Sequence, residues 1–117
     1  IELIKKAMFK VVNESRGTAN YSLISSQLLR KSDKYLFSGK TGTSQVKKIT
    51  VAERESEDFR KKEIKWKEMD HALFVGYMPS INPKYAVSVV IEHGGSGAKT
   101  AAPIAKRIFD YIHELKI

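Results

Sequence analysis

Two apolar runs separated by a short turn constrain the fold of this chain more than any other feature of its sequence. The first run, at 72–78, reads Ala-Leu-Phe-Val-Gly-Tyr-Met, and the second, at 85–91, reads Tyr-Ala-Val-Ser-Val-Val-Ile. Both are rich in the β-branched and aromatic residues that strands favour. The segment between them, from Pro79 to Pro83, has the composition of a turn. The sequence therefore predicts an antiparallel β-hairpin.

Helical periodicity marks both ends of the chain. In the first twelve residues, Ile1, Ile4, Met8 and Val11 recur at helical spacing. After the glycine-rich stretch 94–97, a final helix is predicted by apolar residues that share one face, namely Ala101, Ile104, Ala105, Ile108, Ile112 and Leu115. Two further helices are weaker predictions, a short one at 21–29 and a solvated one at 51–63. For the second of these, a mobile charged loop is an equally good interpretation.

A third strand is predicted at 37–46, where the sequence reads Phe-Ser-Gly-Lys-Thr-Gly-Thr-Ser-Gln-Val. Glycine inside a strand often marks the close approach of a ligand or of another backbone. The predicted fold class is α+β, with a three-stranded antiparallel sheet flanked by N- and C-terminal helices. The simplest arrangement packs both helices on one face of the sheet. With 117 residues, the chain is expected to form one small unit, 1–117.

The charge balance leaves two interpretations open. A net charge of +8 favours anionic partners, yet the positive charges are scattered, and a basic soluble surface is the better explanation. A small basic nucleic-acid-binding module is the alternative function, and it depends on Lys47, Lys48, Arg60, Lys61, Lys62 and Lys65. Acidic residues are interspersed among these, and few aromatic residues are present for base stacking. A salt-dependent nucleic-acid titration distinguishes this alternative.

The sequence Gly39-Lys40-Thr41 does not fit a nucleotide-binding P-loop. That loop needs a glycine at the position of Lys34 and a helix after the threonine, whereas Gly42 and a β-rich segment follow here.

A Lys-Thr-Gly-Thr strand is instead suited to holding an anionic substrate. Lys40 supplies a fixed cation for a carboxylate. Gly42 lets another backbone lie against the strand. Thr41 and Thr43 share strand parity, so their hydroxyls can point the same way. Backbone N–H groups on such a strand can also stabilise an oxyanion.

The order of segments resembles the C-terminal part of the transpeptidase domain of class B penicillin-binding proteins, most closely the elongation-specific group. The resemblance is carried by Phe37–Val46, then Asp-His-Ala-Leu-Phe-Val-Gly-Tyr-Met-Pro at 70–79, then 85–95 and the closing helix. Gly17-Thr18-Ala19 after the first helix also fits. The charged segment 47–67 matches poorly.

The resemblance implies a substrate-binding role for the Lys-Thr-Gly strand. These enzymes are peptidoglycan D,D-transpeptidases: a serine in an S-x-x-K motif attacks a stem peptide ending in D-Ala-D-Ala, and β-lactams acylate the same serine. On that basis Lys40, Thr41, Gly42 and Thr43 bind the substrate. Lys40 and the oxyanion-binding backbone N–H of Thr43 are the expected catalytic groups. No cofactor and no metal are expected.

The nucleophile is expected to lie outside this chain. Two S-x-x-K matches, Ser44–Lys47 and Ser96–Lys99, and one S-x-N match, Ser80–Asn82, all follow or overlap the Lys-Thr-Gly strand. In the family both motifs precede it. Ser96 is explained as a helix N-cap, and the Ser80–Asn82 match by the composition of a turn. The chain is therefore expected to be inactive alone.

The remaining expectations concern partners and location. The resemblance implies peptidoglycan stem peptides, β-lactams and the upstream part of the same domain as partners, and no nucleic acid. It also implies the periplasmic face of the bacterial inner membrane, with an anchoring segment that this chain lacks. The isolated chain is expected to form a homodimer, because unpaired strand edges invite pairing. His71, beside Asp70, is interpreted as making a hydrogen bond where its strand begins rather than as a base or metal ligand. Glu92 and His93 are expected near the edge of the site without direct contact with the substrate, and Trp66 is interpreted as a packing residue.

Overall fold

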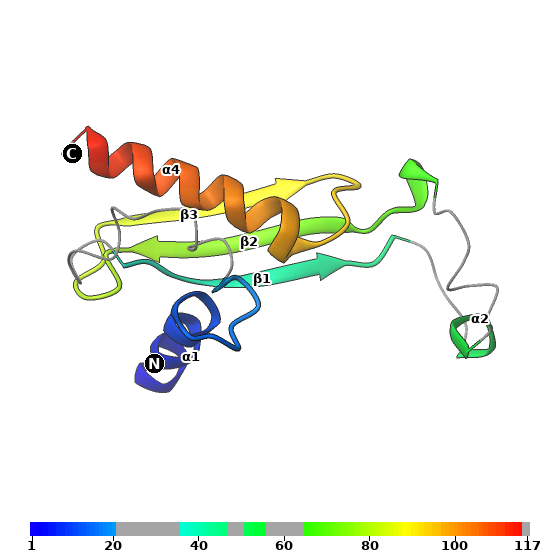
Figure 1. Cartoon of the computed structure of the whole chain (residues 1–117), viewed down its shortest axis with the longest axis horizontal. Helices are drawn as coiled ribbons and strands as arrows, with labels where there is room; N and C mark the ends of the chain where they lie inside the picture. Colours follow the sequence, from blue (N-terminus) through cyan, green and yellow to red (C-terminus); the bar gives the residue numbers. More distant parts are fainter. Residues whose placement is uncertain (21–35, 47–50, 56–64, 116–117) are drawn as a thin grey trace.

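The computed structural model describes residues 1–20, 36–46, 51–55 and 65–115. The elements follow one another in an order close to the predicted one (Figure 1). They are α1 (Glu2–Asn13), β1 (Ser38–Ser44), α2 (Val51–Glu55), the 3₁₀ turn η4 (Trp66–Glu68), β2 (His71–Met78), β3 (Tyr85–Ile91), the π-helical turn η5 (Gly97–Ala101) and α4 (Ala102–Glu114). The helix predicted at 21–29 lies outside the described residues, as does most of the one predicted at 51–63.

The three strands form one antiparallel sheet in the order β1-β2-β3. In the β2–β3 hairpin, Ala72 lies opposite Ile91 and Met78 lies opposite Tyr85. On the other side of β2, the register of β1 runs from Ser38 opposite Tyr77 to Ser44 opposite His71. The predicted hairpin and the third strand are thus confirmed. Within the described part of the chain, the outward edges of β1 and β3 have no neighbouring strand.

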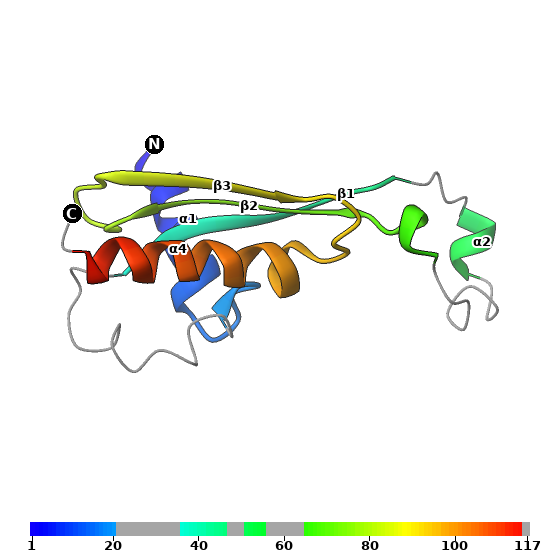
Figure 2. The same ribbon diagram turned by 90° about the horizontal axis from the view of Figure 1, so that it is seen from above.

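The core lies between the sheet and α4, which runs along one face (Figure 2). Strand alternation places Ala72, Phe74 and Met78 on that face. Phe74 contacts Phe37 edge-on, with 6.3 Å between ring centroids, and Phe37 lies 5.1 Å from Phe109 of α4. Burial of this aromatic cluster and of the alanines at the start of α4 stabilises the layer.

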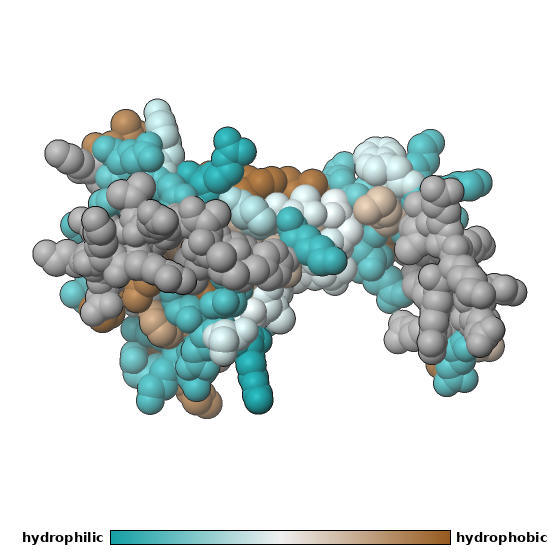
Figure 3. All heavy atoms as spheres, viewed as in Figure 1, coloured by the Kyte–Doolittle hydropathy of each residue, from teal (hydrophilic) through white to brown (hydrophobic). Residues whose placement is uncertain are grey.

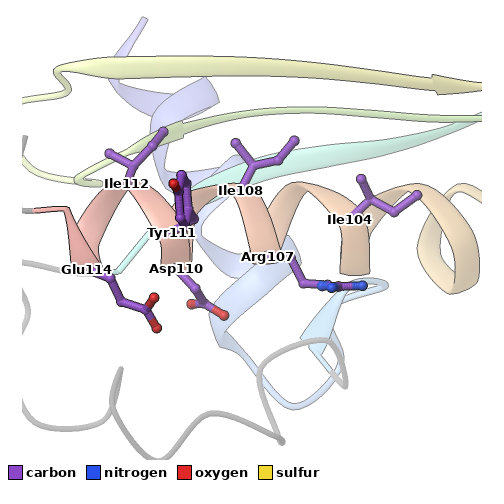
Figure 4. Close-up of a pocket in the computed structure, with 7 residues that line it drawn as sticks. All are labelled: Ile104, Arg107, Ile108, Asp110, Tyr111, Ile112 and Glu114. Atoms are coloured by element: carbon purple, nitrogen blue, oxygen red, sulfur yellow. The ribbon is translucent and has the colours of Figure 1, made fainter.

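The buried side of α4 is rotated relative to the predicted apolar face. Ala101 and Ala105 are fully buried as expected, but Phe109 is buried too, and Ile104 and Ile108 remain 37% and 38% exposed. Ile104, Ile108 and Ile112 point to the same side of the helix, where they help line an open hollow of about 670 Å³ (Figure 4). The buried side of α4 combines alanines with Phe109 and Lys106, so the spacing of the isoleucines alone could not locate that side.

A charged residue also belongs to the buried side of α4. Lys106 is 6% exposed, and its Nζ forms an ion pair with Asp110 Oδ2 at 2.5 Å. The aliphatic part of such a side chain packs as an apolar group while its charge is paired. The spacing of apolar residues in the sequence cannot predict that a lysine is buried at this position.

α1 crosses the β1 edge of the sheet, and only its C-terminal end lies on the side that α4 covers, so the predicted arrangement with both helices along one face is wrong for the N-terminal part of α1. The helix passes the β1 edge of the sheet, with its N-terminal end on the side away from α4 (Figures 1 and 2). Val12 is fully buried, whereas Ile1 and Ile4 are 91% and 64% exposed. Asn13 Nδ2 donates to the carbonyl oxygen of Phe37 at 3.0 Å and ties the end of α1 to the start of β1.

Polar and apolar side chains are mixed over the side of the molecule that carries α4 (Figure 3). Within the described residues, no helix is long and apolar enough to cross a bilayer. No cluster of metal-ligating side chains is found in the same residues.

Candidate substrate-binding strand

The Lys-Thr-Gly sequence lies in the middle of β1, the outer strand beside α1. Lys40 pairs in register with Val75 and projects on the face away from α4, where both side chains are exposed. The Nζ of Lys40 donates to the carbonyl oxygen of Thr41 at 2.6 Å. Its charge is therefore held close to the strand and remains open to solvent.

Thr41 and Thr43 share the opposite face of β1, as their parity predicts. Their partners in β2 are Phe74 and Ala72, which are both fully buried beneath α4. The strand thus presents its cation on one face and two hydroxyls on the other, near the end where Thr43 and Ser44 become exposed.

Gly42 meets another backbone within the chain itself. A Cβ placed on Gly97 would lie 2.2 Å from the carbonyl oxygen of Gly42 and 2.4 Å from that of Leu73. The first turn of η5 therefore rests directly on the β1–β2 ladder, and a side chain at position 97 would displace it. The sequence indicated close backbone approach at Gly42, but it did not identify Gly97 as the partner.

The far end of the strand is fixed by a cluster around the start of β2. Asp70 Oδ1 accepts a hydrogen bond from the backbone N–H of Val46 at 3.1 Å. His71 Nδ1 accepts from the backbone N–H of His93 at 2.9 Å. The ring of Trp66 packs 4.7 Å from that of His93 between centroids. His71 thus makes a hydrogen bond at the start of its strand, as expected, and its partner is the backbone of His93. Trp66 packs against a ring although it is 62% exposed.

Two of the chance motif matches have structural explanations. Ser96 Oγ accepts from the backbone N–H of Lys99, so Ser96 caps the helix as predicted. Ser80 Oγ shares a hydrogen bond with Ser38 Oγ at 2.8 Å, in the turn that contains Asn82 with a positive φ of 54°. Lys47 of the third match lies outside the described residues.

One residue beside the strand had been assigned no role from the sequence. Thr18, in the loop after α1, places its Oγ1 3.0 Å from Oγ1 of Thr41. A Gly-Thr-Ala triplet a few residues after a helix is the available signal, but nothing local connects it with a strand more than twenty residues away.

Residues 1–110 match the family described as penicillin binding protein transpeptidase domain. The chain belongs to this family. Peptidoglycan D,D-transpeptidase MrdA of Haemophilus influenzae is 36% identical over 94% of this chain and 15% of that protein. The Acinetobacter baumannii protein of the same name is 42% identical over 66% of this chain and 11% of its own length.

Solved structures of penicillin-binding protein 2 have the same fold. The Helicobacter pylori protein in complex with MreC superposes with a TM-score of 0.72 at 25% identity, over 97% of this chain and 17% of that one. The Pseudomonas aeruginosa protein in complex with WCK 5153 gives 0.66 at 34% identity, over 94% and 19%. The chain spans about one sixth of the length of these transpeptidase relatives.

Proposed function

We propose that this chain supplies the substrate-binding strand of a peptidoglycan D,D-transpeptidase that cross-links stem peptides and is acylated by β-lactams. One observation carries the proposal: β1 is an outer strand with Lys40 exposed on one face and Thr41 and Thr43 together on the other. Such an edge can pair with an extended peptide while a cation and hydroxyls hold its terminal carboxylate. Family membership supports the assignment, and the periplasmic face of the inner membrane is the proposed location.

The reacting serine is proposed to come from sequence outside these residues. Ser96 caps a helix, and Ser80, in the turn after β2, shares a hydrogen bond with Ser38 of β1, so both serines have structural roles that explain their presence. In the intact enzyme, the serine attacks the substrate carbonyl, the backbone N–H of Thr43 helps stabilise the oxyanion, and D-alanine leaves. Lys40 contributes positive charge to the same region.

Acylation kinetics with a fluorescent penicillin test the assignment in the intact enzyme. We expect Lys40→Ala and Thr43→Val each to lower the second-order acylation rate constant by about 10- to 100-fold, because each removes a group that contacts the anion. Lys84→Ala and Ser88→Ala are the matched controls, since both residues are exposed and lie off β1. Wild-type rates in folded Lys40 and Thr43 variants would contradict the proposal.

The chain alone is proposed to form no stable adduct with the same penicillin. A band that survives denaturing electrophoresis and is lost in Ser96→Ala or Ser44→Ala would show that the nucleophile is present after all.

The isolated chain is also proposed to dimerise, and this state would be separate from its role in the enzyme. The outward edges of β1 and β3 are unpaired among the described strands, and the sheet face away from α4 exposes Val75 and Val90. An open edge is a template for a second copy, and exchange of an identical element is a low-cost route to a dimer. Light scattering coupled to size exclusion tests this, and a strictly monomeric, cooperatively folded species over a wide concentration range would contradict it.

A further inference from the structure

The loop after α1 is held rigidly at its two ends. A Cβ on Gly17 would lie 2.2 Å from the carbonyl oxygen of Val11, so this position must be glycine for the loop to pack against the helix. Ala19 is fully buried, and its backbone N–H donates to the same carbonyl oxygen at 3.0 Å. Asn20 Nδ2 donates to the carbonyl oxygen of Val12 at 3.3 Å. Thr18 is thereby fixed between anchored neighbours, although it is itself exposed.

The fixed loop brings Thr18 to the strand. Its Oγ1 lies 3.0 Å from Oγ1 of Thr41, across 23 positions of sequence, and either hydroxyl can donate. A threonine hydroxyl has one proton to donate and two lone pairs to accept. When Thr41 donates to Thr18, it has no proton left for an anion. When Thr18 donates, the proton of Thr41 is free to point elsewhere.

We propose that Thr18 is a positioning residue for carboxylate recognition, donating to Thr41 so that the hydroxyl of Thr41 donates to the substrate carboxylate. The inference rests on the proposed function, because it needs an anion at Thr41. In this arrangement the two hydroxyls form a chain directed toward the negative charge, and hydrogen bonds in such a chain polarise one another. The rigidity of the loop means that little side-chain order has to be created when the carboxylate arrives.

Two substitutions at position 18 isolate the hydroxyl. Thr18→Val keeps the shape and removes the donor, whereas Thr18→Ser keeps the donor. In the intact enzyme, the second-order acylation rate constant is measured with benzylpenicillin and with its methyl ester, which lacks the carboxylate charge. We expect Thr18→Val to lower the rate constant with benzylpenicillin by about three- to tenfold and to leave the rate constant with the ester unchanged. Thr18→Ser should behave like the wild type with both ligands.

A purely structural role would give a different pattern. If Thr18 only held the loop in place, Thr18→Val would slow acylation by the acid and by the ester to the same extent, and that result would overturn the inference. Thermal unfolding of each variant is recorded alongside. Should Thr18→Val unfold, Thr18→Ala is measured in its place with the same two ligands.

Combination with a second substitution tests whether Thr18 acts through Thr41. Once Thr41→Val has removed the receiving hydroxyl, adding Thr18→Val should cost no more than about a factor of two with benzylpenicillin, because the hydrogen-bonded pair is already broken. Fully multiplicative effects of the two changes would overturn the inference.

The same measurements separate failure of this inference from failure of the proposed function. If Lys40→Ala and Thr43→Val slow acylation while Thr18→Val acylates at the wild-type rate, only the inference about Thr18 is overturned. If all of these variants acylate at the wild-type rate, the proposed substrate-binding role of β1 is contradicted, and the inference about Thr18 fails as well.

Discussion

The two faces of the sheet are built from alternate residues of the same strands, yet they differ sharply in burial. On the face beneath α4, Ala72 and Phe74 are fully buried and Val89 is 7% exposed. On the other face, Val75 is 47% exposed and Val90 is 58% exposed. Apolar residues occupy both faces, which is typical of strands that are covered on both sides. The comparison shows that the strand sequences carry more apolar surface than the described elements cover.

α1 covers a small part of that second face. Met8 lies with Val75, Tyr77 and neighbouring residues of β3 around a shallow hollow of about 460 Å³. The hydroxyl oxygen of Tyr77 is buried there and has no hydrogen-bond partner among the described residues. The face beneath α4 therefore holds the hydrophobic core that stabilises the chain. The opposite face, which carries Lys40, is less covered by the described elements and is available for further contacts.

The largest effect is expected from truncating equivalent central positions on the two faces. Phe74→Ala should lower the free energy of unfolding by about 3–5 kcal/mol, because it empties the centre of the aromatic cluster. Val75→Ala, its neighbour on the open face, should cost less than about 1 kcal/mol because Val75 is already half solvated. Urea unfolding monitored by circular dichroism gives both values, and similar losses would contradict the difference between the faces.

A smaller effect is expected where η5 rests on the strand. Gly97→Ala should destabilise the chain by about 1–3 kcal/mol, since the added Cβ meets two carbonyl oxygens and the helix must shift. Gly42→Ala places its Cβ 3.3 Å from Cβ of Leu73, on the open face, and should cost less. The same unfolding measurement compares the two, and an equal or larger loss for Gly42→Ala would show that the open face is the more tightly packed at this point.

The smallest effect concerns self-association of the isolated chain. Val90→Lys puts a charge on the open face of the outer strand β3 and should raise the dimer dissociation constant about tenfold, because an apolar contact of this size is lost and charged edges resist pairing. Ser88→Lys adds the same charge to the same face of β3 without removing an apolar side chain, so it measures the effect of the charge alone and should raise the dissociation constant less. Sedimentation equilibrium gives both constants, and an unchanged value for Val90→Lys would exclude the open face from the dimer.

Much of the fold follows from local sequence. The hairpin was predictable because each strand is dense in β-branched and aromatic residues and the intervening turn is bounded by prolines. The helix start at Ser96 was predictable because its side chain can accept from a nearby backbone N–H. The parity of Thr41 and Thr43 followed from the two-residue period of a strand. Their roles in binding stay predictions until the acylation kinetics are measured.

What the sequence by itself determined is therefore the three strands, the two terminal helices, the parity of the Lys-Thr-Gly strand and membership of a transpeptidase family. Tertiary structure alone decided which face of the sheet α4 covers, that α1 passes the edge of β1, and that Thr18 and Gly97 meet that strand. The physical reason is the range of the interactions. Propensity, capping and periodicity act over a few residues, whereas Thr18 and Thr41 are 23 positions apart and are brought together only when α1 and β1 pack.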